Sequence, residues 1–372
     1  MSSIYIHIPF CHSKCYYCGF HSVASCKDQS KMVDAICKEL ILRSDFLNGK
    51  TIETIYFGGG TPSILKIEEI EKILNQIKSI HTIVDNPEIS LEANPEDLNR
   101  DFLIGIKNIG INRLSIGIQS LNDDILKFIN RRHTAKEAIE AVCLAKEIGF
   151  DNISIDLIYG IPNQDNSIWE ENLRKIESLP ISHLSSYCLS IDDNTVFSKK
   201  EERGEFSQMP EEESEMQYRM LVEWTKKNGF EHYEISNFCR DGLISRHNTA
   251  YWQDKPYLGI GPAAHSYNIE TRQWNCSNNP KYIKAIESGH LANEVEERDL
   301  DVQFNEYLMT SLRTKWGINL KEMEERFPKA WLEHLSKKII KFKLHLNTSD
   351  NKVSIKEESL FISDEIIAEF FI

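Results

Sequence analysis

The hydrophobic pattern of the first half of the chain switches repeatedly between two periods. Short runs rich in apolar and β-branched residues predict strands at residues 4–8, 54–57, 88–91, 113–118, 152–159 and 183–191. Between them, apolar residues recur every three or four positions and predict helices at residues 31–47, 67–80, 97–108, 123–129, 134–148 and 169–176. This alternation predicts an α/β fold with a parallel sheet and right-handed crossovers.

The number of strand–helix units does not decide how the sheet is wound. Six units are two short of a complete (β/α)8 barrel, so the periodicity allows a doubly wound sheet or an open barrel. Side chains with useful chemistry follow the carboxyl ends of the predicted strands, at residues 11–18, 58–60, 92, 119 and 156. Because barrel active sites are assembled at that face, we expect a partial (β/α)6 barrel.

The pattern changes after residue 191. Helices are predicted at residues 303–312, 320–326 and 330–340, a hairpin at residues 353–355 and 359–361, and a last helix near Glu365. We therefore expect a barrel at residues 1–200, a connecting segment at 201–285 and a smaller α+β module of helices and a two-stranded wing at 286–372.

Composition narrows the class of protein. Hydrophobic residues make up 41% of the 372 residues, which suits a globular core, and no apolar run is long enough to span a membrane. The net charge of −14 argues against a nucleic-acid partner. The first residues do not form a secretion signal, and the nine cysteines are an odd number, so we expect a cytoplasmic protein that uses cysteine for metal binding or catalysis.

Three of those cysteines form a compact motif directly after the first predicted strand. Cys11, Cys15 and Cys18 have the spacing C-x3-C-x2-C. Clustered thiolates bind iron–sulfur clusters or soft metals. A structural zinc site would need a fourth ligand, which His12 or His21 could supply, so a structural metal-binding protein is one alternative.

Several polar residues near predicted strand ends are candidates for a binding site. The turn at residues 58–62 is glycine-rich, and glycine allows close approach of the backbone to a ligand. A carboxylate follows apolar strand residues at two places, Glu92 after Leu91 and Asp156 after Ile155, and can accept hydrogen bonds from hydroxyl or ammonium groups. Taken singly, such residues more often cap helices or form ion pairs.

A second motif, HNTAYW, occupies residues 247–252. An imidazole can ligate haem iron, and aromatic rings offer flat apolar surface to a porphyrin. The alternative is that His247 and Tyr251, one helical turn apart, pack the open side of the barrel.

The cysteine motif resembles the signature of the radical S-adenosylmethionine (SAM) enzymes, which are built on a partial (β/α)6 barrel. The resemblance implies that Cys11, Cys15 and Cys18 ligate a [4Fe-4S] cluster and that SAM binds its fourth iron. It also implies an electron donor such as a flavodoxin or ferredoxin.

Within that superfamily, further stretches are similar to the oxygen-independent coproporphyrinogen III oxidase group. They include residues 5–11, 58–62, 91–95, 115–120, 130–131 and 155–162. The resemblance implies a SAM-binding role for the following positions, with the first beside the cluster: Tyr5, Gly59, Gly60, Thr61, Glu92, Gln119, Arg131 and Asp156.

The group contains oxidases and haem chaperones, and this chain departs from the oxidases. The oxidases have a longer segment before the first cysteine of the motif, whereas only ten residues precede Cys11 here. They also carry a fourth cysteine where this chain has Phe20. The chaperone branch has phenylalanine there and an H-N-x-x-Y-W motif, which implies haem binding near His247, Asn248, Tyr251 and Trp252, with the iron ligand open between His247, His265 and a cysteine.

We therefore expect a haem chaperone that holds a [4Fe-4S] cluster and SAM and passes haem to acceptor haemoproteins. Coproporphyrinogen oxidation by a 5′-deoxyadenosyl radical is the enzymatic alternative, and Phe20 weighs against it. Whether SAM is cleaved is left open, as is transient docking at a membrane-bound acceptor.

Overall fold

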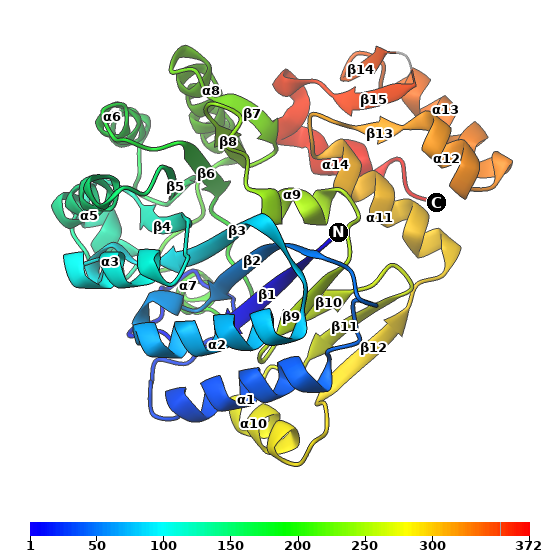
Figure 1. Ribbon diagram of the computed structural model, residues 1–372. Coiled ribbons are helices and arrows are strands. Elements are labelled where there is room, and N and C mark those ends of the chain that lie inside the picture. Colours follow the sequence, from blue (N-terminus) through cyan, green and yellow to red (C-terminus); the bar gives the residue numbers. More distant parts are fainter. Residues whose placement is uncertain (350) are drawn as a thin grey trace.

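A computed structural model of the chain describes residues 1–349 and 351–372. Six parallel strands in sequential order form the centre of the molecule (Figure 1). They are β1 Ser2–Ile8, β2 Ile52–Gly59, β3 Ile83–Ala93, β4 Arg113–Gln119, β5 Asn152–Tyr159 and β6 His183–Cys188. The predicted strands are therefore present, and the last one ends at Cys188 rather than at residue 191.

Helices connect these strands and cover the outer face of the sheet (Figure 1). They are α1 Gln29–Leu42, α2 Ile67–Ile80, α3 Arg100–Asn108, α4 Asp123–Phe128, α5 Ala135–Ile148 and α6 Asn166–Ile176, with short 3-10 turns at Pro62–Ile64 and Pro95–Asp97. Helix α5 ends at Gly149, which adopts a left-handed φ of 98°. The expected partial (β/α)6 barrel is therefore present.

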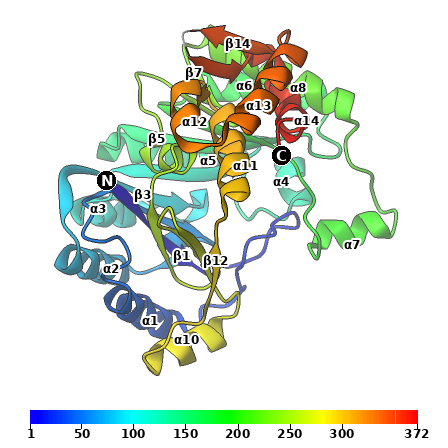
Figure 2. The same ribbon diagram turned by 90° about the vertical axis from the view of Figure 1, so that its right-hand side faces the viewer.

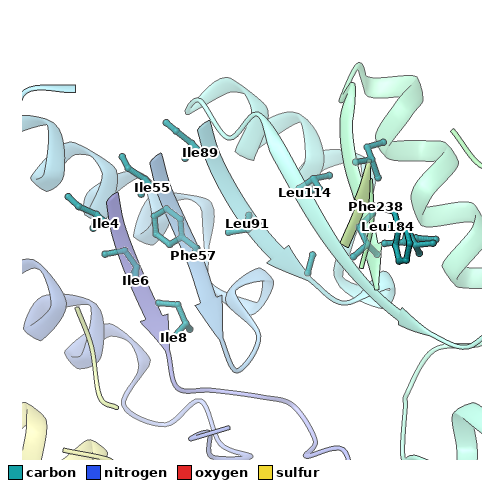
Figure 3. Packing of buried hydrophobic residues seen from close by; sticks show 14 of the residues in the cluster. Ile4, Ile6, Ile8, Ile55, Phe57, Ile89, Leu91, Leu114, Leu184 and Phe238 are labelled. Atoms are coloured by element: carbon teal, nitrogen blue, oxygen red, sulfur yellow. The ribbon is translucent and has the colours of Figure 1, made fainter. Parts of the chain in front are cut away.

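The strands bury two faces of different character. Ile4, Ile6 and Ile8 of β1 are 0–1% exposed and belong to the hydrophobic core, as do alternate residues of the neighbouring strands (Figure 3). The intervening residues, Tyr5 and His7 on β1, point to the opposite face because side chains alternate along a strand. This second face is the interior of the barrel, and many of its residues are polar.

The sheet continues beyond the barrel at both edges. Strand β9 Tyr257–Ile260 pairs in parallel with β1, followed by antiparallel β10 His265–Tyr267, β11 Thr271–Asn275 and β12 Asn293–Glu297. At the other edge, β8 Asn237–Cys239 and β7 Glu231–Glu234 follow β6. The predicted segment 201–285 thus supplies strands to the large sheet, and the division of the chain at residues 200 and 285 stays a prediction.

Four further helices lie between β6 and β12. They are α7 Val196–Glu202, α8 Glu211–Lys227, α9 Arg246–Trp252 and α10 Asn279–Glu287. Helix α7 projects from the body of the molecule in Figure 2, whereas α9 lies against β1 and β2 and carries the HNTAYW motif.

The C-terminal part packs at one end of the barrel (Figure 1). It consists of α11 Leu300–Leu312, β13 Ile318–Asn319, α12 Leu320–Arg326, α13 Lys329–Lys341, β14 Leu346–Ser349, β15 Lys352–Ile355, a 3-10 helix at Glu357–Ile362 and α14 Ser363–Ala368. The predicted hairpin is wrong in one arm: β15 pairs with β14 and β13, and residues 359–361 are helical. None of the helices described combines the length and apolar character of a membrane span.

Candidate functional site

The cysteine loop leaves β1 at the carboxyl end and folds over the barrel interior. Its backbone is tied down at both ends, because Cys11 N donates to the Val23 carbonyl (3.0 Å) and Tyr16 N donates to the Ile129 carbonyl (3.2 Å). Asn130 follows helix α4 with a positive φ of 63° and donates from Nδ2 to the Lys14 carbonyl (2.9 Å). The loop is therefore held by the end of α4 as well as by β1.

Two of the three sulfurs accept hydrogen bonds from side chains in the turn after β2 and in the connection after α4. Arg131 Nη1 lies 3.4 Å from Cys15 Sγ, and Thr61 Oγ1 lies 3.5 Å from Cys11 Sγ. Burial raises the pKa of Cys18 to about 11, with a smaller contribution from Cys15 and Cys11 and against the lowering effect of a backbone hydrogen bond at Phe20. Hydrogen-bond donors directed at the sulfurs suit thiolates that ligate an iron–sulfur cluster, so this donor set fits the group that the sequence predicts.

Arg131 connects the cysteine loop to the barrel strands. Its Nη2 donates to Asn94 Oδ1 (2.6 Å) and to the Gly117 carbonyl (2.5 Å). Burial opposes its charge, but Cys15 and Tyr17 raise the Arg131 pKa above its ordinary value. The guanidinium is thus a fixed positive charge beside the sulfurs.

The glycine-rich turn after β2 brings backbone close to the loop. Gly59 has a φ of 109°, and a Cβ there would lie 2.5 Å from the His7 ring. A Cβ on Gly60 would lie 2.5 Å from the Phe10 carbonyl oxygen. A side chain at either position would therefore displace the turn. This turn can form because glycine has no side chain.

Glu92 lies at the end of β3 and points at this turn. Its Oε2 accepts a hydrogen bond from Gly59 N (3.2 Å), and its Oε1 accepts one from Tyr56 Oη (2.8 Å). Burial and the nearby Asp156 carboxylate raise the pKa of Glu92 to about 7, against the opposing effect of the Tyr56 hydrogen bond. A carboxylate with this pKa readily accepts a cationic or hydroxyl partner.

Asp156 lies on β5 across the barrel interior from β3. Its Oδ1 accepts a hydrogen bond from Ser115 Oγ (3.3 Å), and burial raises its pKa to about 6 although Arg113 acts in the opposite direction. Gln119, at the end of β4, has a positive φ of 68°, a strained conformation for a residue with a side chain.

These residues line a single cavity of about 490 Å³, which we call the cysteine cavity. It contains almost all the predicted cluster and SAM residues: Cys11, Cys15, Cys18, Gly59, Gly60, Thr61, Glu92, Gln119, Arg131 and Asp156. The sequence did not assign roles to Tyr56, Asn94 and Ser115, although polar side chains at inward-facing strand positions are a signal that could have found them.

Tyr5 does not line the cysteine cavity. Its hydroxyl donates to His7 Nδ1 (3.1 Å), and its ring stacks near Tyr56 with centroids 6.2 Å apart. The ring instead lines a neighbouring, larger cavity of about 700 Å³. We call this the tyrosine cavity; its wall includes Tyr5, Tyr251, Tyr257, Tyr267, His265 and Arg272.

The two histidines near the cysteine loop do not complete a zinc site in the described residues. His12 is exposed, and His21 Nε2 lies 2.8 Å from Asn279 Oδ1. In residues 1–349 and 351–372, no three His, Cys, Asp or Glu side chains are grouped as ligands of one metal ion.

The HNTAYW motif faces the barrel interior from α9. His247 is 1% exposed, with Nδ1 2.7 Å from Thr54 Oγ1 and Nε2 2.8 Å from Tyr251 Oη. Burial lowers the pKa of His247 to about 3. Both ring nitrogens therefore have protein partners, while Tyr251 reaches the tyrosine cavity and Asn248 and Trp252 are partly buried.

Comparison with known proteins agrees with this arrangement. Residues 5–176 match the Radical SAM superfamily, and residues 299–365 match the HemN C-terminal domain. The heme chaperone HemW of Bacillus subtilis is 33% identical over 100% of this chain and 99% of its own length. HemW of Lactococcus lactis is 34% identical over 88% of this chain and 85% of its own length.

Among solved structures, coproporphyrinogen III oxidase (HemN) from Escherichia coli shares the fold. The TM-score is 0.86 at 21% identity, over 100% of this chain and 90% of that one. The likeness to HemN shows a shared fold. The identity to the Bacillus protein extends over the full chain and is high enough to show a shared family. The chain therefore belongs to the HemW family of the radical SAM superfamily.

Proposed function

We propose that this protein is a haem chaperone that binds haem and delivers it to acceptor haemoproteins. The observation that carries the proposal is the 33% identity over the whole chain with the Bacillus subtilis protein named heme chaperone HemW. The departure from the oxidases at Phe20 points the same way.

Membership of the radical SAM superfamily implies a [4Fe-4S] cluster and SAM. When bound, such a cluster supplies one electron at a time and an open iron site for SAM. We propose Cys11, Cys15 and Cys18 as its ligands, with Arg131 and Thr61 donating to two of the sulfurs.

SAM would occupy the rest of the cysteine cavity. We propose that Glu92 and the Gly59–Gly60 turn hold the methionine end of SAM and that Gln119, Arg131 and Asp156 contact the remainder. The carboxylates of Glu92 and Asp156 can each accept a hydrogen bond from a ribose hydroxyl or an ammonium group. Tyr5 lines the tyrosine cavity instead, and its place beside the cluster stays a prediction.

The proposed haem role of the HNTAYW motif is modified by its geometry. With both ring nitrogens of His247 engaged, its imidazole could reach iron only after breaking the contacts with Thr54 and Tyr251. We propose that His247 positions the Tyr251 ring in the wall of the tyrosine cavity, with Asn248 and Trp252 on the same helix.

Coproporphyrinogen III oxidation is a second candidate because the fold matches HemN at a TM-score of 0.86. That reaction would remove a propionate hydrogen and release carbon dioxide. The decisive experiment incubates anaerobic, cluster-reconstituted protein with SAM, reductant and coproporphyrinogen III and measures decarboxylated product by chromatography. We expect none, while a genuine oxidase in a parallel reaction forms product.

The chaperone proposal needs its own positive result. Protein loaded with one equivalent of haem is mixed with an apo-haemoprotein, and haem arrival is followed by the acceptor's absorption spectrum. Transfer faster than from the same concentration of haem on serum albumin supports the proposal. Multiple turnovers of coproporphyrinogen, or transfer no faster than from albumin, would contradict it.

Partners and location follow from the same proposal. An electron donor such as a flavodoxin or ferredoxin would reduce the cluster, and acceptor haemoproteins would take the haem. We propose that the protein works in the cytoplasm, where docking at a membrane-bound acceptor requires no membrane-spanning helix of its own.

A further inference from the structure

The tyrosine cavity lies directly beside the cysteine cavity. Lys14, Gly19, Phe20 and Ser22 line both cavities, so the cysteine loop forms the wall between them. Phe20 is 70% exposed, an unusual state for a phenylalanine in a chain with a large core. A flat apolar ligand in the larger cavity would cover this ring.

The cavity has the size and wall of a porphyrin site. Its volume of about 700 Å³ falls in the usual range for small-molecule and cofactor pockets. Tyr5, Tyr251 and Tyr257 provide flat surfaces, and the Tyr251 and Tyr257 rings meet edge to face with centroids 4.5 Å apart. Aromatic rings fixed in this way lose little entropy when a flat ligand packs on them.

Besides the tyrosine hydroxyls, the wall offers three imidazoles and one thioether that could ligate iron: His7, His21, His265 and Met309. His7 is 4% exposed, and its Nε2 donates to the His21 carbonyl (2.9 Å) while its Nδ1 accepts from Tyr5. His21 is engaged through Nε2 with Asn279. The imidazoles of His7 and His21 therefore already have hydrogen-bond partners within the protein.

His265 differs from both. It is exposed, and among the described residues no hydrogen bond involves its ring. Its ring stacks on Trp274 of the paired strand β11, with centroids 6.0 Å apart and planes inclined by 29°. That contact holds the imidazole at a definite place in the wall without using either nitrogen.

The backbone around His265 is shaped to present it. A Cβ on Gly259 would lie 1.9 Å from the His265 carbonyl oxygen, so only glycine lets β9 and β10 approach this closely. Ala263, in the turn between these strands, has a positive φ of 61°. Strain in a turn that presents an unpaired imidazole is typical of a binding position.

Basic groups are available for the carboxylates of a porphyrin. Arg272 pairs with Glu306, but Glu306 also pairs with Arg298, so two guanidinium groups share one carboxylate. Lys14 is exposed on the cysteine loop across the cavity, where its Nζ contacts only the Phe20 carbonyl among the described residues. Arginine is suited to bidentate binding of a carboxylate.

We propose that His265 is the protein ligand to haem iron and that haem lies in the tyrosine cavity with one propionate at Arg272. The inference rests on the proposed function, because it assigns the cargo site of that function. Haem in this position lies against the cysteine loop, next to the predicted cluster.

The test is a titration of the full chain with ferric haem, followed by absorption and electron paramagnetic resonance spectroscopy. His265→Ala should bind haem at least tenfold more weakly and lose the signal of a histidine-ligated ferric iron, and added imidazole should restore that signal. His290→Ala, which changes an exposed histidine outside the cavity wall, should behave as the wild type. Cluster iron and sulfide contents check that both variants fold.

A second comparison tests the propionate contact without removing the ligand. The wild type should bind haem at least fivefold more tightly than haem dimethyl ester, and Arg272→Gln should reduce that preference. A preference that Arg272→Gln leaves unchanged would contradict the placement of the propionate.

The outcomes separate this inference from the function. If the wild type binds and transfers haem but His265→Ala keeps the signal and affinity, the ligand assignment is overturned and the chaperone proposal stands. Loss of the signal in His21→Ala or Met309→Leu would likewise move the ligand there. If the wild type binds no stoichiometric haem, both proposals fail.

Discussion

At the scale of single residues, two buried carboxylates set the character of the cysteine cavity. Glu92 and Asp156 face the same interior, and burial raises their pKa values to about 7 and about 6. After burial, the Tyr56 hydrogen bond has the largest effect on the pKa of Glu92, and Arg113 has the largest effect on the pKa of Asp156; both effects lower the pKa. A SAM molecule carries positive charge, so its binding favours the ionised form of both.

SAM affinity should therefore depend on pH. Below about 7 a proton must leave Glu92 before the carboxylate can accept a cationic partner, so affinity should fall by about tenfold from pH 8 to pH 6. The measurement is an anaerobic binding titration on cluster-loaded protein. Glu92→Gln should bind SAM more weakly than the wild type at pH 8, and its SAM affinity should vary little between pH 8 and pH 6. If the affinity of Glu92→Gln depends on pH as in the wild type, the titrating group is Asp156 instead, and Asp156→Asn tests this.

The cysteine ligands give a simpler prediction. Cys15→Ala should abolish the absorbance and the iron and sulfide content of the cluster without unfolding the chain, because Cys15 is only partly buried. Cys143→Ala, an exposed cysteine on α5, is the matched control and should keep the full content. A Cys15→Ala protein with unchanged iron and sulfide would exclude the cluster assignment.

At the scale of elements, the turn between β2 and the following 3-10 helix is the tightest junction of the site. Its left-handed Gly59 lies against the His7 ring, so the turn couples β2 to β1 and to the cysteine loop. The same turn presents Gly59 N to Glu92 on β3. One glycine thus sets the spacing of three elements.

Gly59→Ala should therefore reduce both stability and SAM binding. The left-handed φ costs roughly 1–2 kcal/mol for alanine, and the clash with His7 adds to this cost. Gly49→Ala is the control, since Gly49 has a φ of 69° but no atom within 4 Å of an added Cβ. Chemical denaturation should show a larger loss for Gly59→Ala, and only that variant should lose at least tenfold in SAM affinity. Equal losses would mean that the close contact is unimportant.

At the scale of the whole molecule, a buried carboxylate joins the start of the chain to its later strands. Glu39 on α1 is 0% exposed and accepts hydrogen bonds from Asn275 Nδ2 (2.7 Å), Tyr282 Oη (2.5 Å) and Gly261 N (2.9 Å). These partners come from β11, from α10 and from the turn after β9. The network fixes the strands that carry His265 against the barrel.

Removing this carboxylate should lower the free energy of unfolding of the whole protein. Glu39→Ala removes the carboxylate from Arg43 and from the three donors, although Arg43 keeps its contacts with the Gly259 carbonyl and Gln273. Breaking a buried pair costs about 3–5 kcal/mol. Asp34 lies on α1 like Glu39, and its ion pair with Lys72 of α2 is exposed. Asp34→Ala should therefore change the free energy of unfolding by no more than about 1 kcal/mol. Equal effects in urea denaturation would show that the network is dispensable.

Local periodicity was enough to predict the strands and helices of the barrel. Alternating residues predicted β1 to β6 and their helices, because the side-chain period of a strand or helix is a property of the backbone. The sequence also predicted that Glu92, Gln119 and Asp156 lie close together, and they line one cavity, although Asp156 lies within β5 and not at its end. The hairpin arm at residues 359–361 failed because the true partner, β14, is a short polar stretch without an apolar alternation.

Contacts between residues far apart in the chain depend on the tertiary structure and could not be predicted from local patterns. The parallel pairing of β9 with β1 joins residues about 250 positions apart and leaves no local signal. The orientation of His247 is likewise without a local signal, because its ring nitrogens contact Thr54 and Tyr251. So is the exposure of His265 in a cavity beside the cysteine loop. Which imidazole is free depends on distant hydrogen-bond partners, and a sequence pattern specifies residue types but not those contacts.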